Sequence, residues 1–322
     1  MQQIDFQDVT LITPTAAMSA AVHGGRAKCL QRLIRLGMPV PTTLALSFDA
    51  VLQIAKGHLP DLAAMLDPFG PSPLLSVRPS SQDPDWGGPG AILNIGMNDE
   101  SHAALSKRVG EAAATALYVR FVQSYAIHVV RLDPDVFDFP NLSDASVLRA
   151  ALETFEAEAD EPFPQDVSVQ LSEVLRSMAR AWDGTSARLL REAKGAPVDA
   201  GLGLVVQALA LGVGADESGS GVIQFVSSAT GQPQIIGRYL SQSQGREALN
   251  DRAGAIYLTS DPRGPALEDI SPDNFAALVS YGAIARTRLR EEMQIEFTLE
   301  DNVLHILDAV RIQRSSRALG QI

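Results

Sequence analysis

Residues 294–310 decide the fold of the C-terminal part of the chain. They begin Gln294-Ile295-Glu296-Phe297-Thr298 and end Leu307-Asp308-Ala309-Val310. Polar and apolar residues alternate along the first segment, as expected of a strand with one buried face. The stretch therefore predicts a β-hairpin whose turn is formed by residues 300–302. A three-residue turn sets Gln294 directly opposite Asp308 in the return strand, with Glu296 on the same face.

That register groups one amide and two carboxylates on one face of the hairpin. Hard oxygen ligands of this kind suit Mg²⁺, so we expect Glu296 and Asp308 to hold a metal ion and Gln294 to contact the ligand beside it. A two-residue turn would instead direct Asp308 to the opposite face. The alternative interpretation is a surface hairpin with ordinary polar positions.

A second candidate segment is Gly24-Gly25-Arg26, which stands directly before an amphipathic helix predicted over residues 27–37. Glycines let the backbone approach a ligand closely, and the free N–H groups of a first helical turn suit a phosphate. Arg26 adds a positive charge beside them. The alternative is an ordinary flexible loop before a helix.

Arg78 is a third candidate, because it ends an apolar strand predicted at residues 74–78. A guanidinium at the end of a strand can project into a cleft and pair with a polyphosphate. The alternative is a surface arginine that caps the strand.

Ser218-Gly219-Ser220-Gly221 is a fourth candidate and is predicted as a turn between two strands. A glycine-rich turn can fold over phosphates, with backbone N–H groups from Gly219 and Gly221 and the hydroxyl of Ser220 as donors. The alternative is a plain hairpin turn, since glycine and serine favour turns in general.

Composition narrows the class of protein. The 322 residues are 46% hydrophobic and 20% charged, with a formal net charge of −12 and one cysteine, Cys29. An acidic chain without a basic stripe argues against nucleic-acid binding. The lone cysteine excludes an internal disulfide framework, and no apolar run reaches the length of a membrane span. We therefore expect a cytoplasmic protein of two or three subdomains.

The order of predicted elements indicates a mixed α+β fold. Strands precede residue 102, helices dominate residues 103–199, and strands return after residue 200, followed by a helix at about 272–292. We expect a first lobe from residues 1–102 and 200–240, a helical insertion at 103–199, and a second lobe at 241–322 that contains the 294–310 hairpin.

In their order and separation, these segments resemble the N-terminal ATP-binding (PEP/pyruvate-binding) domain of pyruvate phosphate dikinase and its relative phosphoenolpyruvate synthase. The resemblance runs from about residue 20 to residue 314. It implies an ATP-grasp-like nucleotide-binding domain that binds Mg-ATP for phosphoryl transfer to a carrier histidine on another domain or subunit. It also implies catalytic roles for Arg26 and Arg78 in neutralising the phosphates, and a covering role for residues 218–221.

Several positions depart from the family pattern. The lysine after the two glycines is Arg26 here, a family carboxylate is Arg238, and a family arginine is Val310. The family's Asp and Gln on the hairpin are exchanged to Gln294 and Asp308. Two hypotheses follow: a phosphotransferase module, or a degenerate relative that binds nucleotide or partners without turnover.

Overall fold

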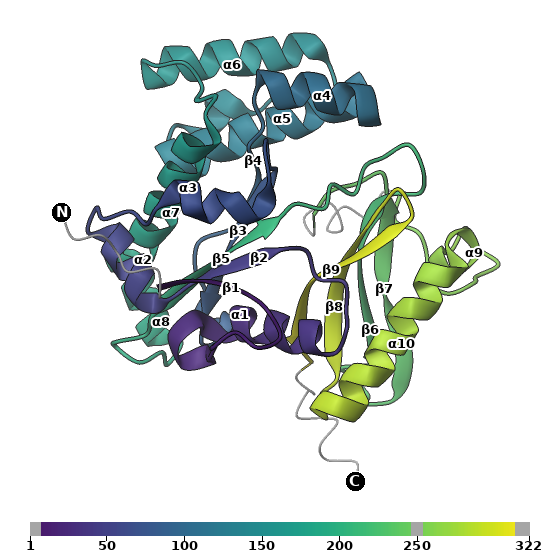
Figure 1. Cartoon of the computed structure of the whole chain (residues 1–322). Helices are drawn as coiled ribbons and strands as arrows, with labels where there is room; N and C mark the ends of the chain where they lie inside the picture. The colour runs from purple at the N-terminus through teal and green to yellow at the C-terminus, as the bar shows by residue number, and fades with distance from the viewer. Residues whose placement is uncertain (1–7, 246–253, 313–322) are drawn as a thin grey trace. The chain divides into compact units, whose positions relative to one another are not determined.

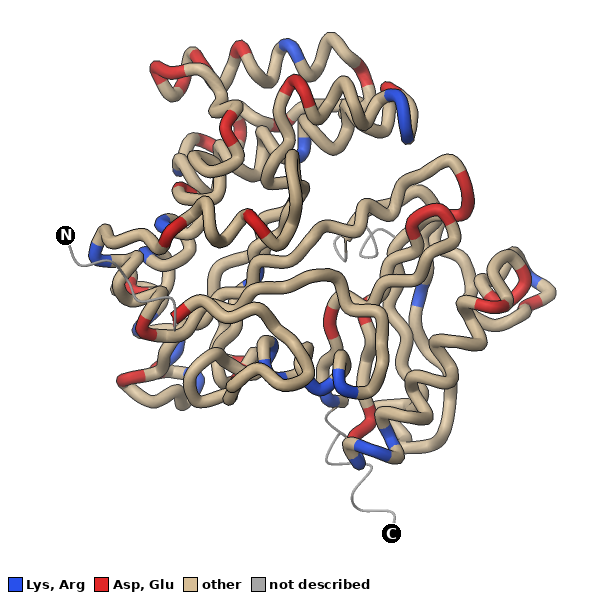
Figure 2. Tube along the Cα trace, viewed as in Figure 1, with Lys and Arg blue, Asp and Glu red and all other residues tan. Residues whose placement is uncertain are grey.

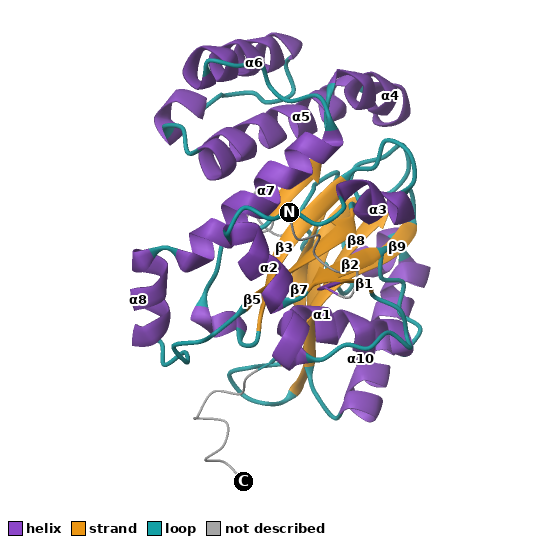
Figure 3. Ribbon diagram, turned by 60° about the vertical axis from the view of Figure 1, so that its left-hand side comes forward, coloured by secondary structure: helices purple, strands orange, loops and turns teal. Residues whose placement is uncertain are grey.

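The computed structural model describes residues 8–245 and 254–312, which form two compact units (Figure 1). Unit 1 consists of Met1–Lys28 and Thr42–Leu209, and unit 2 of Cys29–Pro41 and Ala210–Ile322. The division falls inside helix α1 (Ala20–Arg35). Each unit combines one antiparallel sheet with helices (Figure 3), which confirms the α+β class.

The sheet of unit 1 has five strands in the order β1-β2-β5-β3-β4. Its apolar face carries Leu44, Val206 and Val77, which stand opposite one another on β2, β5 and β3. Gly88 lies close to Pro79 of β3 and to Trp182 of α7 (Val167–Asp183), since a Cβ there would be 3.5 and 3.7 Å from their side chains. The strands are β1 (Val9–Leu11), β2 (Thr43–Leu46), β3 (Leu75–Ser81), β4 (Ile92–Ile95) and β5 (Leu202–Ala208).

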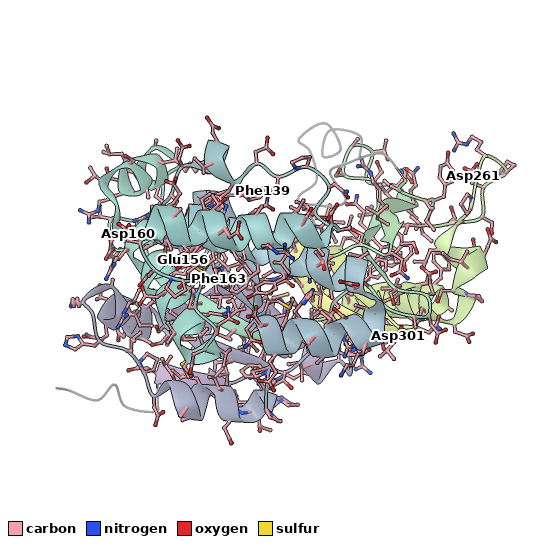
Figure 4. All side chains as sticks on the ribbon, turned by 90° about the horizontal axis from the view of Figure 1, so that it is seen from above. Phe139, Glu156, Asp160, Phe163, Asp261 and Asp301 are labelled. Carbon is pink, nitrogen blue, oxygen red and sulfur yellow. The ribbon has the colours of Figure 1, made fainter. Side chains whose placement is uncertain are left out.

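Helices fill the rest of unit 1, as the helical stretch at 103–199 predicted. An aromatic cluster forms their core: Phe163, labelled in Figure 4, packs edge-on against Phe121, Tyr125 and Phe155 with ring centroids 5.6, 5.3 and 5.1 Å apart. The helices are α2 (Phe48–Ala55), α3 (Leu62–Leu66), α4 (Asp99–Val109), α5 (Glu111–Tyr125), α6 (Ala145–Ala159), α7 (Val167–Asp183) and α8 (Thr185–Ala193). Shorter helical turns are η2 (Asp67–Phe69), η3 (Pro84–Trp86), η4 (Ala126–Val130) and η5 (Pro134–Phe137).

Unit 2 is built on a four-stranded sheet with the order β7-β6-β8-β9. Helix α10 packs on one face of it, where Gly282 leaves room for the ring of Phe225. The strands are β6 (Gly219–Val226), β7 (Pro233–Ser241), β8 (Met293–Glu300) and β9 (Val303–Arg311), and the helices are α9 (Leu267–Ile270) and α10 (Pro272–Leu289). Among the described residues, no helix combines the length and apolar character needed to cross a bilayer.

Strand pairing corrects the expected extent of the first lobe. The sequence predicts one lobe from residues 1–102 and 200–240, but only β5 of the second range joins the first sheet. Strands β6 and β7 pair with β8 in the second sheet, so the units divide at Ala210. Hydrogen bonding between strands distant in sequence leaves no local mark from which this boundary could be predicted.

The predicted glycine-rich turn at 218–221 is also corrected. Gly219 and Gly221 lie inside β6, and their missing side chains make room for two aromatic rings. A Cβ on Gly219 would lie 2.6 Å from the ring of Tyr239, and one on Gly221 would lie 2.3 Å from the ring of Phe297. Those two rings stack with centroids 6.0 Å apart. Packing therefore requires the glycines.

Replacing Gly221 by alanine tests this packing role. The added methyl group must displace Phe297, so we expect Gly221→Ala to lower the free energy of unfolding by about 1–3 kcal/mol. Gly264→Ala is the matched control in unit 2, because its Cβ would make only an ordinary contact, 3.5 Å from Tyr257. Differential scanning calorimetry compares the two variants; equal melting temperatures would contradict the packing role.

Candidate functional site

The start of α1 is anchored to β3 through its two glycines. Gly24 has a φ of +86°, and a Cβ there would lie 1.8 Å from the carbonyl oxygen of Ser80. A Cβ on Gly25 would approach the carbonyl oxygen of Gln82 to 3.1 Å. The glycine pair therefore lets the backbone of α1 touch the backbone of β3, a close approach that no larger residue permits at Gly24.

Polar contacts hold the same junction. The hydroxyl of Ser80 donates to the carbonyl of His23 at 2.7 Å and accepts the N–H of Ala27 at 3.1 Å. The guanidinium of Arg26 donates to the carbonyl of Pro79. One N–H of the first turn after the kink thus already has a partner within unit 1, and Arg26 is held beside β3.

Arg78 lies inside β3, which corrects its expected position at the end of a strand. It is 8% exposed, which is against the alternative of a surface arginine. It shares the second face of the first sheet with Ser76 and Ser80, because side chains two apart in a strand point the same way. Ser80 contacts the start of α1, and Arg78 is the preceding residue of β3 on the same face. Unit 1 therefore brings two predicted phosphate-contacting segments, Gly24-Gly25-Arg26 and the strand that carries Arg78, to one face of one sheet.

The register of β8 and β9 differs from our prediction. The turn contains two residues, Asp301 and Asn302, both with positive φ, and Glu300 pairs with Val303. Such a turn alone would send Asp308 to the wrong face. The strands, however, contain an irregularity between Glu296 and Phe297, after which Glu296 pairs directly with Asp308.

The consequence is a corrected site on the polar face of the second sheet. Gln294 stands opposite Val310, rather than opposite Asp308 as expected. Glu296 and Asp308 face each other and are 8% and 6% exposed. An extra residue in β9, Leu307, restores the carboxylate to this face.

Neighbouring polar groups order this face. The amide of Gln294 donates to Gln224, its partner on β6, at 3.0 Å. Asp308 accepts the N–H of Ala309 at 2.9 Å. Ser220 lies on the same face opposite Thr298, and its hydroxyl donates to the carbonyl of Ser243 at 2.8 Å. Within residues 8–245 and 254–312, no group of three or more His, Cys, Asp or Glu side chains is placed to hold a metal.

Sequence reasoning overlooked Ser80 and Gln224. Ser80 is two residues after Arg78, a position that the period of two could have indicated, whereas Gln224 is opposite Gln294 on the neighbouring strand. The first could be found once β3 was extended beyond Arg78. The second needs the pairing of β6 with β8, which the sequence does not show.

Charge is distributed unevenly along the chain (Figure 2). The last turns of α1 and α10 are basic, with Arg32 and Arg35 in the first and Arg286 and Arg288 in the second. Arg32 forms an ion pair with Glu291 at 3.0 Å. Cations at these helix ends suit the negative end of the helix dipole, so this charge is explained by the helices themselves.

Two histidines near these segments have a lowered pKa. The pKa of His23 lies below its ordinary value of 6.5 because burial disfavours the charged ring, although the backbone of Ser19 and the carboxylate of Asp8 oppose the shift. Burial likewise lowers the pKa of His305, against the attraction of Glu300. Both rings therefore favour the neutral form in the folded chain.

The stability of the folded chain should decrease as the pH is lowered through the range in which the unfolded chain protonates His23 and the folded chain does not. We expect the melting temperature to drop from about pH 7.5 to about pH 5.5, and His23→Gln to reduce that drop. His58→Gln is the matched control, because His58 is exposed and belongs to the same unit. Differential scanning calorimetry over this pH range measures the melting temperatures of both variants. Equal dependence of the melting temperature on pH in the two variants would contradict a buried neutral His23.

Comparison with known proteins agrees with the motifs. Pyruvate, phosphate dikinase of Rhizobium meliloti (strain 1021) is 26% identical over 342 residues, covering 93% of this chain and 38% of the relative. The enzyme of Clostridium symbiosum is 27% identical over 336 residues with the same coverage, and pyruvate, phosphate dikinase 2 of Oryza sativa subsp. japonica is 26% identical over 334 residues.

No family model matches the chain. The chain spans 38% or less of the length of these curated relatives, so they are similar to it only in part. The predicted resemblance to the N-terminal domain of pyruvate phosphate dikinase is confirmed over nearly the whole of this chain.

Proposed function

We propose that the chain is an ATP-grasp-like phosphotransferase module, which binds Mg-ATP and delivers a phosphoryl group to a carrier histidine on another domain or subunit. The direct pairing of Glu296 with Asp308 on the polar face of β8 and β9 carries the proposal. The similarity to pyruvate, phosphate dikinases over 93% of the chain supports it independently.

Two carboxylates are enough for a nucleotide-bound magnesium ion. Mg²⁺ keeps several waters and is usually bound by one or two carboxylates together with substrate phosphates. Glu296 and Asp308 meet that requirement, since residues opposite each other in adjacent antiparallel strands have Cα atoms only about 4.5–5.5 Å apart. The bound ion would neutralise phosphate charge. Gln294, held by Gln224, adds an amide oxygen two residues away from Glu296 on the same face of β8.

Unit 1 supplies the phosphate-contacting residues of the proposal. Arg26 and Arg78 bring two guanidinium groups to one sheet, and the carbonyl of Pro79 fixes the first of them. Gly24 and Gly25 present backbone close to the same strand. Because phosphoryl transfer depends on positioning and on neutralising charge, side chains fixed in this way suit the reaction better than mobile ones.

Residues 219–221 have a smaller role in the proposed site than a glycine-rich turn over the phosphates would have. Gly219 and Gly221 shape the opposite, apolar face, whereas Ser220 points to the polar face. Its hydroxyl accepts the N–H of Gly245 at 3.2 Å in addition to donating to Ser243. Ser220 thus holds residues 243–245 beside the polar face rather than covering phosphate itself.

Calorimetric titration tests the metal site. We expect the wild-type chain to bind Mg-ATP, and Asp308→Asn to weaken that binding at least about tenfold, because one charged metal contact is lost. Asp273→Asn is the matched control: Asp273 is exposed at the start of α10, in the same unit. Binding of ATP without Mg²⁺ should differ little between the two variants.

The outcomes separate the metal site from the whole proposal. Absence of Mg-ATP binding by the wild-type chain would overturn the nucleotide function. Binding that Asp308→Asn and Asp273→Asn leave equally strong would retain the function and reject Glu296 and Asp308 as its metal ligands.

The second candidate function is a non-catalytic nucleotide-binding or regulatory module. It is favoured by Val310, which stands opposite Gln294 on the polar face at the position of the family's arginine. Loss of one electrostatic partner of the transition state costs about 10²–10³ in rate. Such a chain would bind Mg-ATP and transfer no phosphoryl group.

Label transfer distinguishes the two candidates. We expect the chain, mixed with ATP labelled in its β- and γ-phosphates and a separately expressed phosphohistidine domain of a pyruvate phosphate dikinase, to leave an acid-labile label on that domain. Asp308→Asn should reduce the rate of labelling. No label in the presence of normal Mg-ATP binding would favour the regulatory module.

A further inference from the structure

One row of side chains crosses all four strands on the polar face of unit 2. Arg238 on β7 pairs with Val222 on β6, Val222 pairs with Glu296 on β8, and Glu296 pairs with Asp308 on β9. Residues paired in an antiparallel sheet point to the same face. The row therefore reads cation, apolar residue, carboxylate, carboxylate.

The spacing of this row leaves room over Val222 for a phosphate group between Arg238 and a metal held by the carboxylates. Adjacent strands lie about 4.8 Å apart, so the backbones of Arg238 and Glu296 are separated by roughly 10 Å, with Val222 between them. Val222 is half-buried, whereas Ser220 and Gln224, its neighbours on the same face of β6, are buried. Arg238 is half-buried as well, whereas Glu296 and Asp308 are buried, so the more accessible part of the row runs from Arg238 to Val222.

The backbone on either side of Arg238 is fixed. A Cβ on Gly237 would lie 1.9 Å from the carbonyl oxygen of Val222, so only glycine lets β7 approach β6 this closely. Tyr239, on the opposite face, is fully buried, and its hydroxyl donates to Glu217 at 2.5 Å. Arg238 is therefore held on the polar face between two anchored residues.

We propose that Arg238 binds a phosphate group of the nucleotide over Val222, while the metal held by Glu296 and Asp308 binds the same polyphosphate from the other side. The inference rests on the proposed function. An arginine can grip two phosphate oxygens at once, and the carboxylates two strands away need the metal to share the same anion. Arg238 thereby supplies to this face the positive charge that Val310 does not.

Charge and shape variants of Arg238 test the proposal. In calorimetric titration with Mg-ATP, Arg238→Gln should weaken binding at least about tenfold, because it removes a charge-assisted contact. Arg238→Lys should retain part of the affinity, since the charge remains but the bidentate grip is lost. Arg311→Gln is the matched control, because Arg311 pairs with Met293 on the other face of the same sheet and should bind Mg-ATP as wild type does.

Melting temperatures complete the test. Phosphate binding predicts that Arg238→Gln still unfolds in one cooperative transition, well above the temperature of the titration, while its affinity for Mg-ATP falls. Because Arg238 is half-buried, the melting temperature of this variant is measured beside that of Arg311→Gln. Equal Mg-ATP affinity of the Arg238→Gln and Arg311→Gln variants would overturn the role of Arg238 and leave the nucleotide function intact. If Arg238→Lys loses as much affinity and as much melting temperature as Arg238→Gln does, Arg238 has a structural role and the proposed phosphate contact is overturned. If the wild-type chain binds no Mg-ATP, the proposed function itself fails.

Discussion

The pairing register of β8 and β9 is the constraint on which the proposed metal site of unit 2 depends. A two-residue turn closes the hairpin, and a single extra residue in β9 reverses the side-chain alternation beyond it. Without that residue, Asp308 would point to the face that carries Phe297 and Ile295. An ionised carboxylate among apolar side chains is strongly disfavoured. The pairing of Glu296 with Asp308 on the polar face therefore requires the irregularity in β9.

Each sheet has one apolar face and one face that carries polar residues. In unit 1, Leu44, Val77 and Val206 form the apolar face, and in unit 2 the apolar face carries the stacked rings of Tyr239 and Phe297. The second face of each sheet carries the polar residues, which are tied by hydrogen bonds such as that of Gln207 with Thr43 at 3.0 Å. Buried polar groups need such partners to be tolerated, and the same bonds fix their geometry.

Much of the fold could be predicted from periodicity. The hairpin at 294–310, the helical stretch at 103–199 and the helix near 272–292 all follow from spacing of apolar residues, and the structure contains each of them. The extra residue in β9 could not be predicted, because Leu307 continues an apolar run after Ile306 and carries no signal of its own. Because the prediction lacks this extra residue and has a longer turn, it pairs Gln294 with Asp308 instead of with Val310.

Other differences have identifiable physical causes. Glycine and serine favour turns, yet Gly219 and Gly221 lie in a strand because Tyr239 and Phe297 need the space. Proline is a usual strand breaker, yet β3 runs through Pro79, where its pairing with β4 has already ended and only β5 remains as partner. For this reason Arg78 is buried within a strand rather than placed at its end.

A crystal structure of the chain with Mg²⁺ and a non-hydrolysable ATP analogue tests the central claim most directly. The account predicts a metal ion about 2.1 Å from an oxygen of Glu296 and an oxygen of Asp308, with the remaining ligands supplied by phosphate and water. A nucleotide whose metal is held by other residues, with the polar face of β8 and β9 unoccupied, would contradict it.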